Sequence, residues 1–181
     1  MCWFSRGGIF SAVFSTLFCG CASTSDIPAV RDFDLDRYLG TWYEIARLPH
    51  RFERGLDYVR AEYSRAPDGT VKVTNYGVRD GGKRSIVGRA KLKDPRAVPP
   101  VGELRVSFFW PFYGAYRIIE VDPEYRYAVV TGSSRDYLWI LSRTPKLPES
   151  LLAAIIGRLG KLGFAMDKLE FPRQETDSGA L

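Results

Sequence analysis

The sequence predicts an all-β protein: an eight-stranded antiparallel up-and-down barrel with one C-terminal α-helix packed outside. Three observations lead to this fold class. Eight strand-like segments follow one another between residues 41 and 143, most connections between them are short, and one amphipathic helical pattern follows the last segment. The chain has 181 residues, of which 45% are hydrophobic and 26% charged. This length and composition suit one globular domain with a sizeable core.

Turn signals separate the predicted strands. Apolar and polar residues alternate within them, as in residues 58–65, where Val59, Ala61 and Tyr63 share one face. Pro-Asp-Gly at residues 67–69 and Asp-Gly-Gly at residues 80–82 are turn sequences. In chain order, we expect strands at residues 41–48, 58–65, 70–78, 85–93, 103–109, 113–121, 126–131 and 136–143. Closing such a meander into a barrel removes its exposed edges.

One helix is predicted after Pro148, which suits a first helical turn, and Gly163 is a suitable stop. Six apolar residues recur at helical spacing and form one stripe: Leu151, Leu152, Ile155, Ile156, Leu159 and Leu162. We expect this helix to pack outside the barrel, because the interior of an eight-stranded barrel has no room for it. A helix lying on a membrane surface is the alternative, which the few nearby charges disfavour.

The N-terminal residues have the features of a signal peptide. Arg6 supplies a positive charge, and residues 7–20 form an uncharged stretch too short to span a bilayer. This stretch ends in Gly20-Cys21-Ala22, which resembles the lipobox of bacterial lipoproteins. We therefore expect residues 1–20 to be a signal peptide, Cys21 the lipid anchor, and residues 21–32 a lipidated tether. An ordinary secretory signal is the alternative.

The residue after the proposed anchor suggests a location. Ala22, rather than Asp, follows Cys21, which resembles the pattern of outer-membrane lipoproteins. Several acyl chains on one cysteine anchor a protein firmly. We expect a lipid-anchored protein of the outer membrane whose domain faces the periplasm.

Few residues of the mature chain suit catalysis or metal binding. Cys2 and Cys19 leave with the signal peptide, Cys21 is the proposed anchor, and His50 is the single histidine. We therefore expect no catalytic residue, no metal site, no disulfide and no cofactor. The net charge of +5 is milder than that of a dedicated nucleic-acid-binding protein. The sequence thus predicts a binding protein rather than an enzyme.

Two blocks at the ends of the predicted barrel resemble the lipocalins. Residues 40–46 read Gly-Thr-Trp-Tyr-Glu-Ile-Ala, like the family's first block, and residues 136–145 resemble its last strand. The helix and a short strand at residues 167–171 match as well. The resemblance covers about residues 33–172, the expected barrel domain with its helix, and residues 173–181 are expected to be a flexible tail. Within the family, the chain is most similar to bacterial outer-membrane lipocalins, which bind fatty acids and lysophospholipids and are implicated in envelope maintenance.

The resemblance implies three structural residues at the closed end of the barrel. Trp42 would plug that end, and Arg143 would lie across its indole ring, where a cation contributes about 0.5–2 kcal/mol. Gly40 would permit the tight entry into the first strand after one short helical turn.

Side chains alternate between the two faces of a strand, so placing Trp42 and Arg143 inside the barrel predicts which other residues line a ligand cavity. Apolar walls with a few polar groups and aromatic rings suit an amphiphile. The predicted ligand-binding residues are Glu44, Ala46, Tyr63, Asn75, Phe108, Arg117, Tyr137 and Trp139. The pattern of the sixth strand fits either register, and the resemblance favours Arg117 inward. An inward Arg117 needs a partner, either Glu44 or a ligand carboxylate or phosphate. Alternatively, Glu44 and Arg117 pair with each other or face solvent.

The expected partners are a lipid ligand, a fatty acid or lysophospholipid, and the outer membrane through the acyl chains. No nucleic acid is expected, and a homodimer is left open. The strongly basic residues 79–96 either face anionic lipid headgroups or form a solvated hairpin surface. The predicted function is to bind and store or transport lipids in the cell envelope. The alternatives are a carrier of another small hydrophobic ligand and a structural envelope lipoprotein without a ligand.

Overall fold

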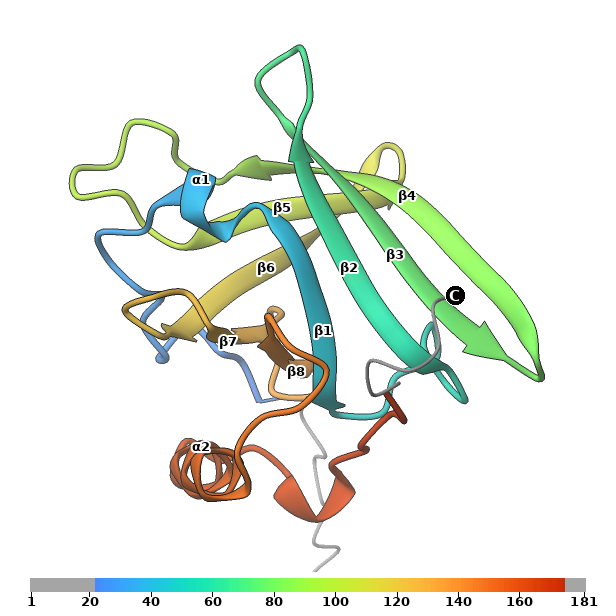
Figure 1. Cartoon of the computed structure of the whole chain (residues 1–181). Coiled ribbons are helices and arrows are strands. Elements are labelled where there is room, and N and C mark those ends of the chain that lie inside the picture. Colours follow the sequence, from blue (N-terminus) through green and yellow to red (C-terminus); the bar gives the residue numbers. More distant parts are fainter. Residues whose placement is uncertain (1–21, 175–181) are drawn as a thin grey trace, which may run out of the picture.

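The computed structural model, described for residues 22–174, is a closed barrel in which each strand pairs antiparallel with the next (Figure 1). The strands are β1 (Gly40–Arg47), β2 (Asp57–Arg65), β3 (Val71–Arg79), β4 (Gly82–Leu92), β5 (Glu103–Phe109), β6 (Phe112–Val121), β7 (Tyr127–Thr131) and β8 (Leu138–Ser142). β8 closes the barrel by pairing with β1. The predicted fold class is confirmed. The predicted signal peptide (residues 1–20), the anchor Cys21 and residues 175–181 lie outside the described residues.

The closed end of the barrel is built around Trp42, which is fully buried. The short helix α1 (Leu35–Tyr38) crosses this end, and the Trp42 Nε1–H donates to the carbonyl of Tyr38 at 2.8 Å. The guanidinium carbon of Arg143 lies 3.8 Å from the centroid of the Trp42 ring. Arg143 also donates to the carbonyls of Thr41 (2.9 Å) and Arg37 (2.7 Å). Strand β1, helix α1 and the chain after β8 are thereby joined at one point.

Gly40 is needed in this arrangement for two reasons. Its φ of +96° lies in the region that side chains rarely adopt. A Cβ there would also lie 3.3 Å from Nη1 of Arg143. A larger residue would strain the backbone and displace the guanidinium from the Trp42 ring.

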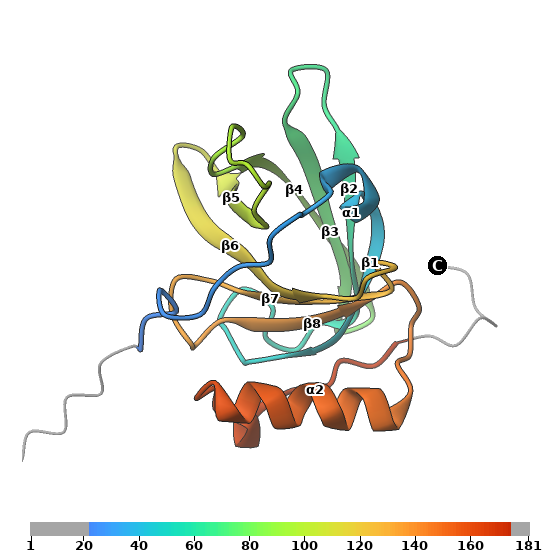
Figure 2. The same cartoon turned by 90° about the vertical axis from the view of Figure 1, so that its left-hand side faces the viewer.

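Helix α2 (Glu149–Lys161) packs on the outside of the barrel, below β7 and β8 in Figure 2. Its buried residues Ile155 and Leu159 belong to a cluster with outward-facing residues of three strands, Ile45, Val129 and Ile140. The predicted position of the helix is therefore confirmed. No helix within residues 22–174 is long and apolar enough to cross a membrane.

The strand predicted at residues 167–171 is not formed. A 3-10 turn, η1 (Met166–Lys168), takes the first part of this segment, and a single bridge joins Glu170 to Arg47 of β1. Because the turn takes up residues 166–168, the segment contacts β1 at one bridge and does not pair along it.

Residues 22–31 differ from the predicted free tether because they pack along the barrel (Figure 2). The Thr24 hydroxyl donates to the carbonyl of Gly132 at 2.7 Å, and Thr24 and Ile27 are almost completely buried. The Val30 amide donates to the carbonyl of Ile118 in β6 at 2.9 Å. A small, polar composition indicated a linker, but two buried residues and backbone pairing fix the segment in place.

Arg173 and Gln174, predicted to belong to a flexible tail, are held on the barrel. The Arg173 guanidinium donates to Asp57 (2.7 Å), and the Gln174 amide donates to the carbonyls of Glu44 (2.7 Å) and Val59 (2.8 Å). These hydrogen bonds attach the two residues to β1 and β2.

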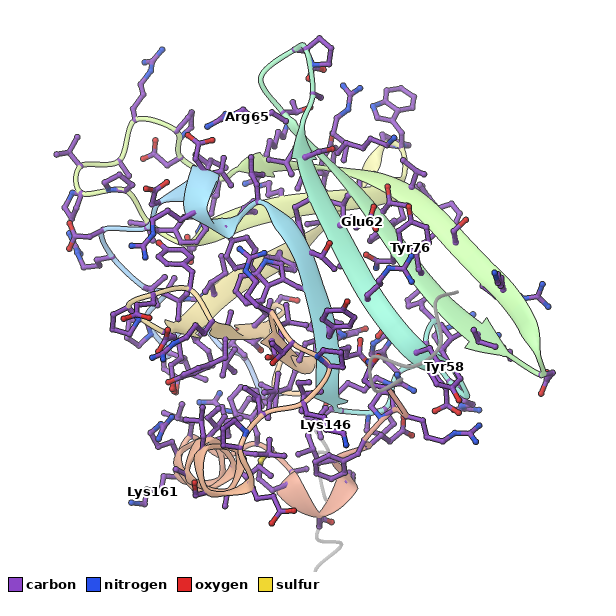
Figure 3. The ribbon with its side chains drawn as sticks, in the orientation of Figure 1. Tyr58, Glu62, Arg65, Tyr76, Lys146 and Lys161 are labelled. Atoms are coloured by element: carbon purple, nitrogen blue, oxygen red, sulfur yellow. The ribbon has the colours of Figure 1, made fainter. Side chains whose placement is uncertain are left out.

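The outer face of β2 and β3 is polar, in keeping with strand alternation. On this face the Tyr76 hydroxyl donates to Glu62 at 3.2 Å. Arg65 has the inward parity of Tyr63 but lies at the closed end of β2, where it pairs with Asp36 of α1 at 2.7 Å. Glu62, Arg65 and Tyr76 are labelled in Figure 3. The alternate residues Val59 and Tyr63 are buried inside.

We predict that Trp42→Ala lowers the free energy of unfolding by about 3–5 kcal/mol, the usual cost of emptying a buried Trp site. Trp110→Ala is a matched control, because Trp110 is 84% exposed, and it is expected to change stability by less than about 0.5 kcal/mol. Urea denaturation measures both. Similar losses in the two variants would show that Trp42 does not hold the closed end together.

Candidate functional site: the barrel interior and its mouth

Three tyrosines occupy the closed half of the barrel interior. The hydroxyl of Tyr116 lies 2.7 Å from that of Tyr38 and 2.9 Å from that of Tyr63. Burial raises the pKa of Tyr38 and Tyr116 well above the ordinary value, and it raises the pKa of Tyr63 to about 12. The hydroxyls are therefore neutral and satisfy one another. Tyr63, a predicted ligand-binding residue, forms part of this floor.

The predicted position of Arg117 is wrong. Tyr116 and Ile118 belong to the interior cluster, so Arg117 points to the outside of β6. Its guanidinium pairs with Glu103 at 2.9 Å and donates to the carbonyls of Thr24 and Ile27, the latter at 2.6 Å. The N-terminal segment covers Arg117, which explains how an outward arginine is nevertheless only 15% exposed.

A β-bulge in β1 corrects a second prediction. Glu44 pairs with Leu141, but Ala46 pairs with Ile140, so one residue is inserted between them. The bulge turns Ala46 outward, where it is fully buried against the cluster beneath α2. It also turns Arg47 inward, opposite Trp139. Strict alternation predicts Arg47 on the outside. The only sequence signal of a break is that the neighbours Ile45 and Ala46 are both apolar, so the alternation is lost there.

A cluster of buried charged residues results at the mouth of the barrel. Arg47 is 2.7 Å from Glu44 and 3.1 Å from Glu170. The connection between β1 and β2 adds His50 and Glu53, which lie 2.7 Å apart, and the Trp139 Nε1–H donates to Glu53 at 3.0 Å. The predicted residues Glu44 and Trp139 are thus brought together. They hold the β1–β2 connection across the mouth instead of lining an open wall.

The two buried carboxyls of this cluster have opposite pKa shifts. Burial, and then the neighbouring Glu53, raise the pKa of Glu44 well above the ordinary value despite Arg47. Burial also acts to raise the pKa of Glu53, but hydrogen bonds from His50 and Trp139, together with the charge of Arg47, bring it below its usual range. Glu44 is therefore the group of this pair that keeps a proton.

The inner face of β3 changes from apolar to polar toward the mouth. Val71 and Val73 are buried in the interior cluster, and Asn75 and Arg79 follow on the same face. Asn75 Oδ1 and Arg79 Nε are buried without a hydrogen-bond partner in the described structure. Arg84 of β4 pairs in register with Gly77, so it lies on the same inward face as Asn75 and Arg79, at the rim of the mouth. Sequence reasoning found Asn75 but assigned Arg79 and Arg84 only to a basic surface.

Aromatic residues surround the mouth. Tyr137 is 36% exposed, and its ring stacks on that of Trp139 with a centroid distance of 6.2 Å. The His50 ring lies 5.2 Å from Trp139. The predicted residue Tyr137 therefore belongs to the rim.

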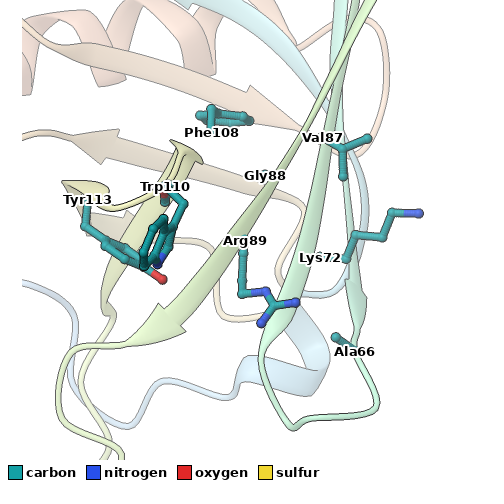
Figure 4. A pocket seen from close by; sticks show the side chains of 9 residues that line it. Ala66, Lys72, Val87, Gly88, Arg89, Phe108, Trp110 and Tyr113 are labelled. Atoms are coloured by element: carbon teal, nitrogen blue, oxygen red, sulfur yellow. The ribbon is translucent and has the colours of Figure 1, made fainter.

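A hollow of about 550 Å³ lies where β4 departs from β5, and its lining runs from Trp110 in the β5–β6 turn to Ala66 at the end of β2 (Figure 4). Phe108, a member of the interior cluster, lies in its wall with Trp110 and Tyr113. A Cβ on Gly88 would lie 2.6 Å from the Phe108 ring, so glycine is needed for this approach. The predicted residue Phe108 thus separates the barrel interior from an outer hollow.

The sequence matches the model of the lipocalin-like domain over residues 33–174. The chain belongs to the lipocalin family. Binding of small hydrophobic ligands is the general function of lipocalins. This chain is 42% identical to outer membrane lipoprotein Blc of Citrobacter freundii, over 91% of this chain and 93% of the relative. Its identity to outer membrane lipoprotein Blc of Escherichia coli K12 is also 42%, over 92% of this chain and 95% of the relative.

Solved structures share the lipocalin fold at lower identity. Insecticyanin from the tobacco hornworm Manduca sexta has a TM-score of 0.70 at 20% identity, covering 87% of this chain and 88% of the other. Lobster apocrustacyanin A1 has a TM-score of 0.67 at 19% identity, covering 87% and 89%. These likenesses concern the fold alone.

We predict that Glu44 makes the lipocalin less stable as the pH rises. The folded-state pKa of Glu44 is raised above an unfolded value of roughly 4.3, so the folded state holds the proton more tightly. This stability is present below the unfolded pKa and is lost as the pH rises through the folded pKa. Melting temperatures of the wild type should therefore fall, relative to those of Glu44→Gln, as the pH rises above roughly 4.3. Parallel curves would mean that Glu44 is ionised throughout.

Proposed function

We propose that this lipocalin binds single-chain anionic lipids, fatty acids or lysophospholipids, and carries or stores them in the cell envelope. The observation that carries the proposal is the polarity of the inner face of β3. Apolar residues lie deep, Asn75 follows with an amide oxygen that has no hydrogen-bond partner, and Arg79, whose Nε is also unpaired, lies at the mouth. An acyl chain along the apolar part would leave its headgroup beside Arg79 and Arg84.

The mouth cluster supports an anionic headgroup at the rim and not deeper. Arg47 is already paired with two acidic side chains, Glu44 and Glu170. A buried anion there would meet the negative charges of Glu53 and Glu170 without a free cation. Arg79 has no ion pair within the described residues, so it is the better partner for a carboxylate or phosphate.

We further propose that Cys21 carries the acyl anchor and holds the lipocalin on the periplasmic face of the outer membrane. The sequence of the Gly20-Cys21-Ala22 junction and the identity to relatives named outer membrane lipoproteins support this. A carrier of a different hydrophobic ligand remains the second candidate, because the apolar interior and the aromatic rim suit many such molecules.

Arg79→Gln should weaken binding of a fatty acid about tenfold or more, because a hydrogen bond between charged groups contributes about 1.5–3 kcal/mol. Binding of the fatty alcohol of the same length should barely change, since the acyl chain is common to both ligands. Lys83→Gln is the matched control, because Lys83 lies on the opposite face of the same hairpin. Fluorescence titrations measure all three proteins. Equal weakening for acid and alcohol would point to a damaged barrel and would refute the headgroup role.

Cys21→Ala should move the protein from the membrane pellet to the soluble fraction at high salt, which screens attraction between basic residues and lipid headgroups, without lowering its melting temperature. Mass spectrometry of the wild type should find acyl chains on Cys21. Wild-type protein that carries no acyl chain on Cys21, or a Cys21→Ala protein that sediments with outer membranes at high salt as the wild type does, would refute acyl anchoring.

A further inference from the structure

The N-terminal residues next to the proposed anchor are fixed at one end of the barrel. The Arg135 amide donates to the carbonyl of Ala22 at 2.8 Å, and the Thr24 amide donates to the carbonyl of Ser133 at 3.3 Å. Ser133 and Arg135 belong to the connection between β7 and β8. In an up-and-down barrel this connection lies at the same end as those of β1–β2, β3–β4 and β5–β6, which is the mouth. An acyl group on Cys21, one residue before Ala22, would therefore leave the protein at the rim of the mouth without a flexible linker.

The same end exposes an unusual group of aromatic side chains. In the β5–β6 turn, Phe109 is 64%, Trp110 84% and Phe112 77% exposed. Phe52, in the β1–β2 connection, is 66% exposed. In Figure 2 the β5–β6 turn lies at the upper left and the first described residues lie at the lower left. Exposed rings of this kind are typical of surfaces that enter the interfacial region of a bilayer.

The charges beside these rings are basic. Lys91 and Arg105 are register partners on the outer face of β4 and β5, and the amine of Lys91 lies 4.7 Å from the ring of Tyr113, the residue after Phe112. Neither forms an ion pair with another described residue. Arg51 and Arg54 flank Phe52 in the β1–β2 connection. Such a surface matches anionic headgroups and would repel a second copy of itself.

We propose that the mouth of the barrel docks directly on an anionic bilayer, with Phe109 and Phe112 of the β5–β6 turn inserted among the headgroups. This orientation extends the proposed function, because it rests on an anchor at Cys21 and places the ligand site against the membrane. The partner is the lipid surface itself, recognised by aromatic insertion and positive charge.

The orientation can be measured on the acylated full-length protein in vesicles that contain phosphatidylglycerol and a nitroxide-labelled lipid. A fluorophore is attached at Phe112→Cys, or, as the matched control, at Val98→Cys. Val98 is 93% exposed in the β4–β5 connection at the closed end. Quenching at position 112 should exceed quenching at position 98 at least threefold. Equal quenching, or stronger quenching at position 98, would overturn the proposal.

A second measurement separates docking from anchoring. At low salt, the Cys21→Ala protein, which lacks the proposed acyl anchor, should float with vesicles containing phosphatidylglycerol, and Phe109→Ser/Phe112→Ser should lower the bound fraction at least threefold. Val98→Ser should leave it unchanged. If the double variant floats like its parent, or if it abolishes a dimer in solution instead, the aromatic turn does not bind lipid and the proposal fails. Failure of acylation would appear separately in the mass of Cys21, and failure of ligand binding would appear in titrations without vesicles.

Discussion

The pairing of β1 with β8 is the constraint on which the rest of the structure depends. It closes the barrel, so no strand edge is left open. It is secured at one end by Arg143, which covers the Trp42 ring and donates to carbonyls of Thr41 and Arg37. Once Trp42 is fixed inside, the face of every regular strand is determined by alternation, including the row from Val71 to Arg79 that supports the proposed lipid site.

The bulge in β1 is the main departure from this alternation, and it determines which charged side chains lie at the mouth of the barrel. It exchanges Ala46 for Arg47 on the inner face and thereby joins a guanidinium to Glu44 and Glu170. Burying such charges is costly unless each has a partner. His50, Glu53 and Trp139 complete the set, so the β1–β2 connection is held across the mouth mainly by polar contacts. Connections held in this way open more readily than those packed in an apolar core.

These two features also explain what sequence reasoning could and could not find. The barrel, its strand order, the outer helix and the interior position of Tyr63 depend on local alternation and turn residues, so the sequence alone predicts them. The position of Ala46 depends on a bulge that alternation cannot reveal. The position of Arg117 depends on residues 22–31, which cover the outside of β6 from a distant part of the chain. The tether prediction was wrong for the same reason, since a segment rich in small residues packs here through non-local contacts.

The path of the N-terminal segment has a consequence for lipid transfer. A lipid that moves between a bilayer and a distant pocket exposes its acyl chain to water, at a cost of about 0.8 kcal/mol for each CH₂ group. With the mouth against the bilayer, as proposed, the acyl chain would pass from hydrocarbon into the apolar interior beyond Asn75. The headgroup would stay in one polar layer throughout, between the bilayer headgroups and Arg79. The fixed segment at residues 22–31 would then be the element that keeps the two compartments in contact, because a free tether would let the barrel turn its mouth away.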